Sequence, residues 1–290
     1  MFGAASILAP VSGDFGGSTT MELMLVGAGC GAVGVWVVQF GRAFLAESFT
    51  HALLPGLVLA AIAGASLLAG ALAGVLLAYV VTLALQQVPK TSSAAATSVS
   101  VTLLVSAGAL IATSNAATVT FESLLFGDPL AASARDVALA TALALGIGVT
   151  LVVMHARFGA LAFDRGSAAT LGVGVGATSA VLLALMLVTV AVAANVAGSL
   201  LALALVTGPA LGALALTQRV GAAIGLAAAL GALSGIGGLY LSYYADWPAS
   251  ACVAVIAGAT ALLPATAQAI RSALAGGGRR ASRPSPAAGL

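Results

Sequence analysis

The stretch from Thr50 to Pro89, THALLPGLVLAAIAGASLLAGALAGVLLAYVVTLALQQVP, contains no Asp, Glu, Lys or Arg. A transmembrane helix needs roughly 20 consecutive apolar residues, so this stretch is long enough for two such helices. Gly64-Ala65-Ser66, followed by Gly70, offers the turn chemistry that a break between them requires. The stretch therefore predicts a helical hairpin inside a membrane.

The whole chain has the composition of a membrane protein. Hydrophobic residues make up 61% of it and charged residues only 6%, against about 25% charged in an ordinary soluble domain. A further long run, from Gly166 to Gln218, is predicted to divide near Asn195–Ser199. Together with a helix at about Met21–Gly41, the uncharged runs predict an all-α, polytopic protein with about nine transmembrane helices. The runs are Thr50–Pro89, Thr91–Phe121, Val137–Met154, Gly166–Gln218, Val220–Ala245 and Trp247–Ile270.

The basic residues predict the orientation of these helices. With the N-terminus outside and the C-terminus in the cytoplasm, only Arg135 falls on the outer side. Such an excess of Lys and Arg is typical of cytoplasmic loops. The basic residues on the predicted inner side are Arg42, Lys90, Arg157, Arg165, Arg219, Arg271, Arg279, Arg280 and Arg283.

These boundaries divide the chain into three parts. Residues 1–20 are expected to be an extracytoplasmic segment without a cleavable signal peptide, because they contain no Lys or Arg and no clear apolar core. Residues 21–272 form the transmembrane domain, and residues 273–290, rich in Gly, Pro, Ser and Arg, read as a disordered cytoplasmic tail. The net charge of +2 owes its sign to this tail, so no nucleic-acid partner is expected.

Several classes of catalytic site are disfavoured. The only lysine, Lys90 in QVPKTSS, lacks the glycines that cradle phosphate in a P-loop. There is also no G-x-S-x-G elbow and no H-E-x-x-H helix. Cys30 and Cys252 stand alone in apolar surroundings and read as core residues. We therefore expect neither an enzyme nor a permanently bound cofactor, and place any ATP hydrolysis on another chain.

Glu47 and His51 are the main candidates for a binding site. Four residues are about one helical turn, so both side chains project from the same helix face. Ionisable residues inside a membrane span are candidates for an ion or proton path, and this pair is a plausible half-site for a divalent metal. Pro55 lacks an N–H and so leaves the His51 carbonyl as a possible third ligand. Alternatively, His51 makes a packing hydrogen bond and Glu47 lies in the headgroup region near Arg42.

Two other segments carry signals of their own. In ARFGALAFDRGSAATLGV, Asp164 is suited to cap a short helix, although a plain solvated loop is also consistent with this segment. The loop FESLLFGDPLAASARD holds the densest charge on the outer side, where it is either solvated or docks an external partner. Gly208-Pro209 is predicted to break the seventh span, with small faces at Gly198 and Gly212 for close helix packing.

Three stretches together resemble the membrane permeases of zinc and manganese ABC importers. They are FGRAFLAESFTHALLPGLVLA, LLFGDPLAAS and AGSLLALALVTGPALGALALTQR. The resemblance implies a multi-pass protein of the bacterial cytoplasmic membrane, paired with a second permease copy or a paralogue. It also implies cytoplasmic ATP-binding subunits and an extracytoplasmic metal-binding receptor as partners.

The same resemblance implies roles for particular residues. Glu47 and His51 match the acidic and His positions of the family's metal path, although the family often has Asp after Gly where this chain has Glu47 after Ala46. The segment from Phe163 to Gly172 resembles the helix that couples the permease to its ATPase. The residues implied there are Phe163, Asp164, Arg165, Ala168, Leu171 and Gly172.

The sequence thus supports a hypothesis with several rivals. Two copies would bring two Glu47 and two His51 side chains around one Zn or Mn ion, with ferrous iron third, in an ATP-driven importer. The alternatives are a proton-coupled secondary transporter, an ABC permease for a vitamin B12 or iron-chelate type of substrate, and a structural membrane scaffold.

Overall fold

The computed structural model describes residues 14–113, 134–264 and 266, in which helices are joined by short turns and no strand occurs. The first five helices are α2 (Asp14–Gln39), α3 (Ala43–Ala52), α4 (Leu54–Ile62), α5 (Leu67–Gln86) and α6 (Ser93–Ala112). They are followed by α8 (Ala134–Phe163), α9 (Arg165–Thr170), α10 (Val175–Ala197), α11 (Ser199–Leu216), α12 (Val220–Ala245) and α13 (Ala249–Thr260).

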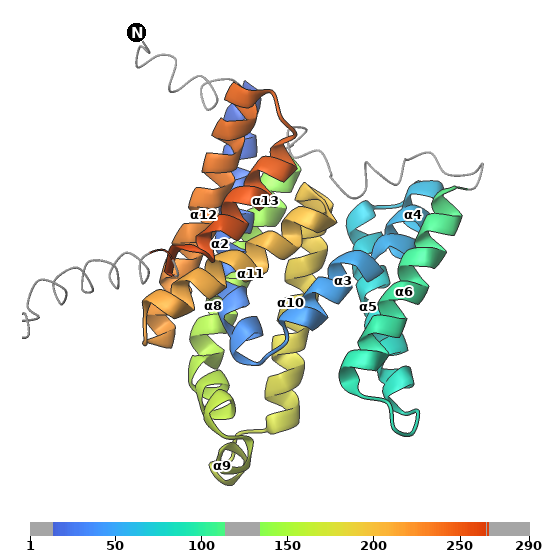
Figure 1. The fold of residues 1–290 in the computed structure, drawn as a ribbon, viewed down its shortest axis with the longest axis vertical. Helices are drawn as coiled ribbons and strands as arrows, with labels where there is room; N and C mark the ends of the chain where they lie inside the picture. The colour runs from blue at the N-terminus through green and yellow to red at the C-terminus, as the bar shows by residue number, and fades with distance from the viewer. Residues whose placement is uncertain (1–13, 114–133, 265, 267–290) are drawn as a thin grey trace, which may run out of the picture.

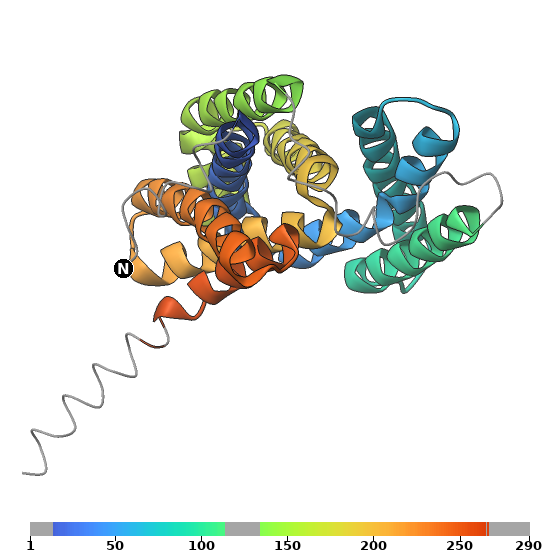
Figure 2. The ribbon, with the colours of Figure 1, turned by 90° about the horizontal axis from the view of Figure 1, so that it is seen from above.

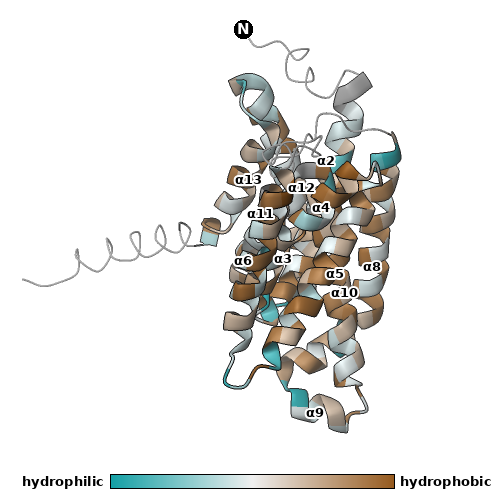
Figure 3. Cartoon of the chain, turned by 90° about the vertical axis from the view of Figure 1, so that its right-hand side faces the viewer, coloured by the Kyte–Doolittle hydropathy of each residue, from teal (hydrophilic) through white to brown (hydrophobic). Residues whose placement is uncertain are grey.

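The helices have the lengths and the surface that a membrane requires. Seven segments of the described chain are long and apolar enough to cross a bilayer, and α3 and α4 together form one of them. Leu201–Leu216 and Ala249–Thr260 are shorter apolar helices. Hydrophobic residues cover the middle of the bundle, and hydrophilic ones gather toward its ends (Figure 3). The all-α membrane class is confirmed, while the count of nine spans and the orientation stay predictions.

Both predicted breaks within the long runs are confirmed. Gly64, at φ +65°, lies in the turn between α4 and α5. Gly198, at φ +83°, separates α10 from α11. Such positive φ values favour glycine, which has no Cβ to clash with the backbone. The turns predicted from local chemistry therefore also delimit the helices.

Two predicted boundaries differ from the structure. Gly208-Pro209 does not break the seventh span, because Pro209 lies inside the continuous helix α11. Neighbouring helices make proline tolerable in a membrane span, and here α13 packs closely against α11 at Gly208. The first helix, α2, begins at Asp14, before the predicted start at Met21. Residues 273–290 lie outside the described part of the chain.

The helices form two groups joined by α3. Helices α4, α5 and α6 make one group, and α2, α8 and α10 to α13 make the other (Figure 1). Seen from above, α3 bridges the two groups along the same side as α11 (Figure 2). Within each group the helices approach closely at small residues, for example Gly27 of α2 against Gly231 of α12, and Gly56 of α4 against Gly70 of α5.

Candidate functional site

The helix that bridges the two groups carries Glu47 and His51. The side of α3 that packs on its neighbours includes Ala46, Phe49 and Thr50, which are all buried. Glu47 is exposed on the single chain, and His51 is half-buried. Because both residues belong to the same regular helix, one turn apart, the two side chains share its outward face.

In the described part of the chain, neither the Glu47 carboxylate nor the His51 imidazole forms a hydrogen bond or an ion pair with another group. The nearby hydroxyls bond the backbone instead: Thr50 Oγ1 donates to the Glu47 carbonyl at 2.6 Å, and Ser48 Oγ donates to the Phe44 carbonyl at 2.7 Å. The described residues also include no group of three His, Cys, Asp or Glu side chains suited to hold a metal. On its own, α3 thus presents one free carboxylate and one free imidazole.

A bend immediately follows these two residues. Helix α3 ends at Ala52, α4 begins at Leu54, and Pro55 lies in the first turn of α4. The N–H of Leu53 faces the carbonyls of Phe49 and His51. Helix α6 covers the bend at Gly108, where any side chain would collide with the Pro55 nitrogen. The proline therefore lies at the break between α3 and α4, which together form one span.

The predicted cap at Asp164 is confirmed. Its carboxylate accepts hydrogen bonds from the N–H of Gly166 at 3.2 Å, and from the N–H and hydroxyl of Ser167 at 2.8 and 2.6 Å. The hydroxyl and the two N–H groups of α9 stabilise the ionised form and lower the pKa of Asp164. The cap thus fixes the start of α9 at one end of the bundle (Figure 1).

Large exposed apolar side chains lie just before and just after helix α9. Phe163 is 90% exposed and Leu171 is 75% exposed, while Ala168 is buried against the bundle. Gly172, at φ +78°, turns the chain toward α10. The segment is a short, capped helix held by one small side chain and flanked by two uncovered apolar ones.

Comparison with known proteins identifies the family. Residues 17–268 match the ABC 3 transport family. The chain belongs to this family. The chain is 28% identical to the manganese transport system membrane protein MntC of Halalkalibacterium halodurans, over 81% of its own length and 80% of that protein. It is also 28% identical to the zinc transport system membrane protein TroC of Treponema pallidum, over 78% and 79% of the two lengths.

A solved structure has the same fold. "PsaBC from Streptococcus pneumoniae in complex with Fab" superposes on this ABC 3 family chain with a TM-score of 0.82 and 21% identity. The match covers 90% of this chain and 94% of that one. The family match confirms the predicted resemblance, and the chain is a multi-pass transport component of the bacterial cytoplasmic membrane.

Some polar groups of this family member were not among the predicted site residues. Glu22 of α2 is only 2% exposed and interacts electrostatically with Asp136 of α8. Its signal in the sequence is an acidic residue inside an otherwise apolar span. Arg42, which the sequence marks only as a basic residue of the predicted inner side, lines one cavity together with Arg165 of the predicted coupling segment. Most of the predicted outer loop, residues 121–133, lies outside the described part of the chain.

Proposed function

We propose that this chain is the membrane permease subunit of an ATP-driven importer for a divalent metal ion. The observation that carries the proposal is the free carboxylate and imidazole on the outward face of α3. A carboxylate exposed to hydrocarbon is energetically unfavourable, so some group must bind to this face of α3 within the membrane. A metal ion held against a second protein surface meets that need.

The second surface is that of another permease copy or a paralogue. Pairing about a twofold axis next to α3 brings two Glu47 and two His51 side chains together. Two carboxylates neutralise a divalent ion, and carboxylate with imidazole is a donor set that Zn binds in tetrahedral sites. Mn favours oxygen ligands and higher coordination, which the carboxylates also supply. We therefore name Zn or Mn as the transported ion and rank ferrous iron third.

Energy for transport comes from ATP bound on partner chains. In this proposal α9 docks on an ATP-binding subunit, with Phe163 and Leu171 entering an apolar cleft of that subunit. Burying exposed apolar side chains of this size favours association. Arg165 and Gly172 orient the two ends of the docked helix. A metal-binding receptor delivers the ion at the opposite end of the bundle.

The central test compares the only two histidines of the chain. We expect His51→Ala to lower metal uptake by cells at least about tenfold, because loss of a metal-site group weakens binding by that order. His155→Ala is the matched control, because His155 is exposed on α8, next to the ring of Trp36. Equal membrane levels of the two variants are checked by fluorescence-detected size-exclusion chromatography. Normal uptake by the His51 variant would remove the site assignment.

A reconstitution experiment separates ATP-driven import from proton-coupled transport. Liposomes containing the permease alone are given a proton gradient and radioactive Zn or Mn. The proposal expects no active accumulation until the ATP-binding subunit and ATP are supplied. Accumulation driven by the gradient alone would instead assign Glu47 and His51 to a proton relay.

A further inference from the structure

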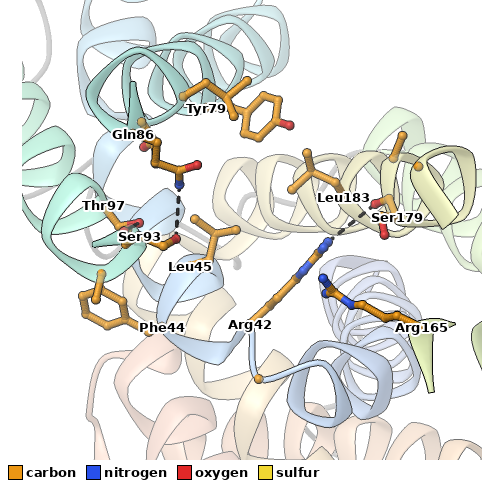
Figure 4. A pocket seen from close by; sticks show the side chains of 16 residues that line it. Arg42, Phe44, Leu45, Tyr79, Gln86, Ser93, Thr97, Arg165, Ser179 and Leu183 are labelled. Atoms are coloured by element: carbon orange, nitrogen blue, oxygen red, sulfur yellow. Dashed lines mark hydrogen bonds between the residues drawn. The ribbon is translucent and has the colours of Figure 1, made fainter. Parts of the chain in front are cut away.

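A cavity of about 720 Å³ lies between the two groups of helices, on α3, α5, α6, α9 and α10. This volume is in the range of small-ligand sites, roughly 300–1,000 Å³. Leu45, Leu83 and Leu183 contribute apolar walls, while Gln86 and Ser93 contribute polar groups. Gln86 Nε2 donates to Ser93 Oγ at 3.1 Å, across the turn between α5 and α6 (Figure 4).

Two guanidinium groups meet in this cavity. Arg42, half-buried before α3, donates to the Ser179 carbonyl at 3.5 Å, and Arg165 of α9 extends toward it (Figure 4). Burial, followed by the positive charge of Arg165, lowers the pKa of Arg42. Arginine nevertheless stays charged in proteins, so the cavity holds two like charges.

The described lining offers these arginines no counter-charge. No Asp or Glu is among the residues that line the cavity. The neighbouring Asp164 directs its carboxylate to the N–H groups of its own helix cap. Two unneutralised guanidinium groups beside an apolar wall suit a ligand that has an anionic group at one end and an apolar chain at the other.

The cavity also lies at headgroup level. Arg42 sits between the ends of the spans Gly17–Gln39 and Ala43–Ile62, and Arg165 follows the end of the span Ala134–Phe163. Both guanidinium groups are therefore at the boundary of the hydrocarbon, whichever side of the membrane this end faces. Phosphate groups of lipids occupy that level, and their acyl chains extend toward the middle of the bundle.

We propose that this cavity binds an anionic phospholipid, with the phosphate between Arg42 and Arg165 and an acyl chain along Leu83 and Leu183. The lipid would join the α5–α6 hairpin to α9 and α10 by neutralising both arginines. This inference does not depend on which ion is transported or on the role of Glu47 and His51.

The test measures lipid binding by the full-length permease. The purified protein is titrated with phosphatidylglycerol or phosphatidylcholine and followed by native mass spectrometry. We expect phosphatidylglycerol to be retained preferentially. Each of Arg42→Gln and Arg165→Gln should weaken its binding about fivefold, as expected for loss of one cation near anionic lipid. Arg42→Lys keeps the charge and should retain most of the binding.

Arg157→Gln and Arg219→Gln are the matched controls, because both arginines are exposed and lie outside the cavity. Equal retention of the two lipids, or equal losses in the control variants, would overturn the proposal. A final experiment tests whether inorganic phosphate competes with the lipid. If phosphate alone displaces phosphatidylglycerol at millimolar concentration, the cavity is a site for a free anion and not for a lipid.

Discussion

At the scale of single residues, the cap of α9 allows a test of the proposed coupling between the permease and its ATP-binding subunit. Asp164→Ala removes the acceptor of two N–H groups and one hydroxyl, so the docking helix loses its fixed start. We expect metal-stimulated ATP hydrolysis by the assembled importer to fall by on the order of fivefold. Asp164→Asn is the control, since asparagine is also a good N-cap, and it should keep most of the activity. Equal activity of the alanine variant and the wild type would exclude a coupling role for the cap.

The pKa of Asp164 gives this cap a defined pH dependence. Because its folded-state pKa lies below the ordinary value, the carboxylate stabilises α9 above that ordinary value, about 4. This contribution is lost only as the pH falls through the lowered folded-state pKa. We therefore expect hydrogen-exchange protection of the Gly166 and Ser167 amides, relative to unstructured peptide rates, to be constant from about pH 5 to 8. A marked loss of protection within that range would contradict the assignment.

At the scale of elements, glycines set the distance between α4 and α5. A Cβ at Gly74 would lie 2.5 Å from the Leu53 carbonyl oxygen, at the bend between α3 and α4. Overpacking of this kind costs about 1–3 kcal/mol, so we expect Gly74→Val to lower the melting temperature in detergent by about 5 °C or more. Gly148→Val on α8 is the matched control, because nothing lies within 4 Å of its Cβ position. Equal melting temperatures of the two variants would show that α4 and α5 can move apart at Gly74 without loss of stability, and would contradict this prediction.

At the scale of the whole molecule, the proposed pairing places two α3 helices face to face. The native cysteines, Cys30 and Cys252, are buried and can be replaced by alanine to give a background without thiols. In that background we expect Glu47→Cys to form a disulfide between copies in the membrane under mild oxidation. Val152→Cys on α8 is 79% exposed and should give none. Cross-linking at position 152 but not at 47 would reject pairing along α3.

The sequence by itself determined the class of the protein and its local features. Long, predominantly apolar runs indicate membrane helices from composition alone. Turn glycines and the Asp164 cap act on residues only a few positions away. The placement of Glu47 and His51 on one helix face followed from spacing alone. The family resemblance also depends on short stretches of neighbouring residues, so it could be identified without the tertiary structure.

Only the tertiary structure decided what each helix face meets. Pro209 lies in an unbroken helix because α13 packs beside it, and no local pattern contains that contact. Likewise α3 bridges two groups of helices, and Arg42 meets Arg165 in one cavity, although these arginines are far apart in the chain. Such encounters depend on the packing of helices that are distant in sequence, whereas hydrophobicity, turns and caps depend on near neighbours.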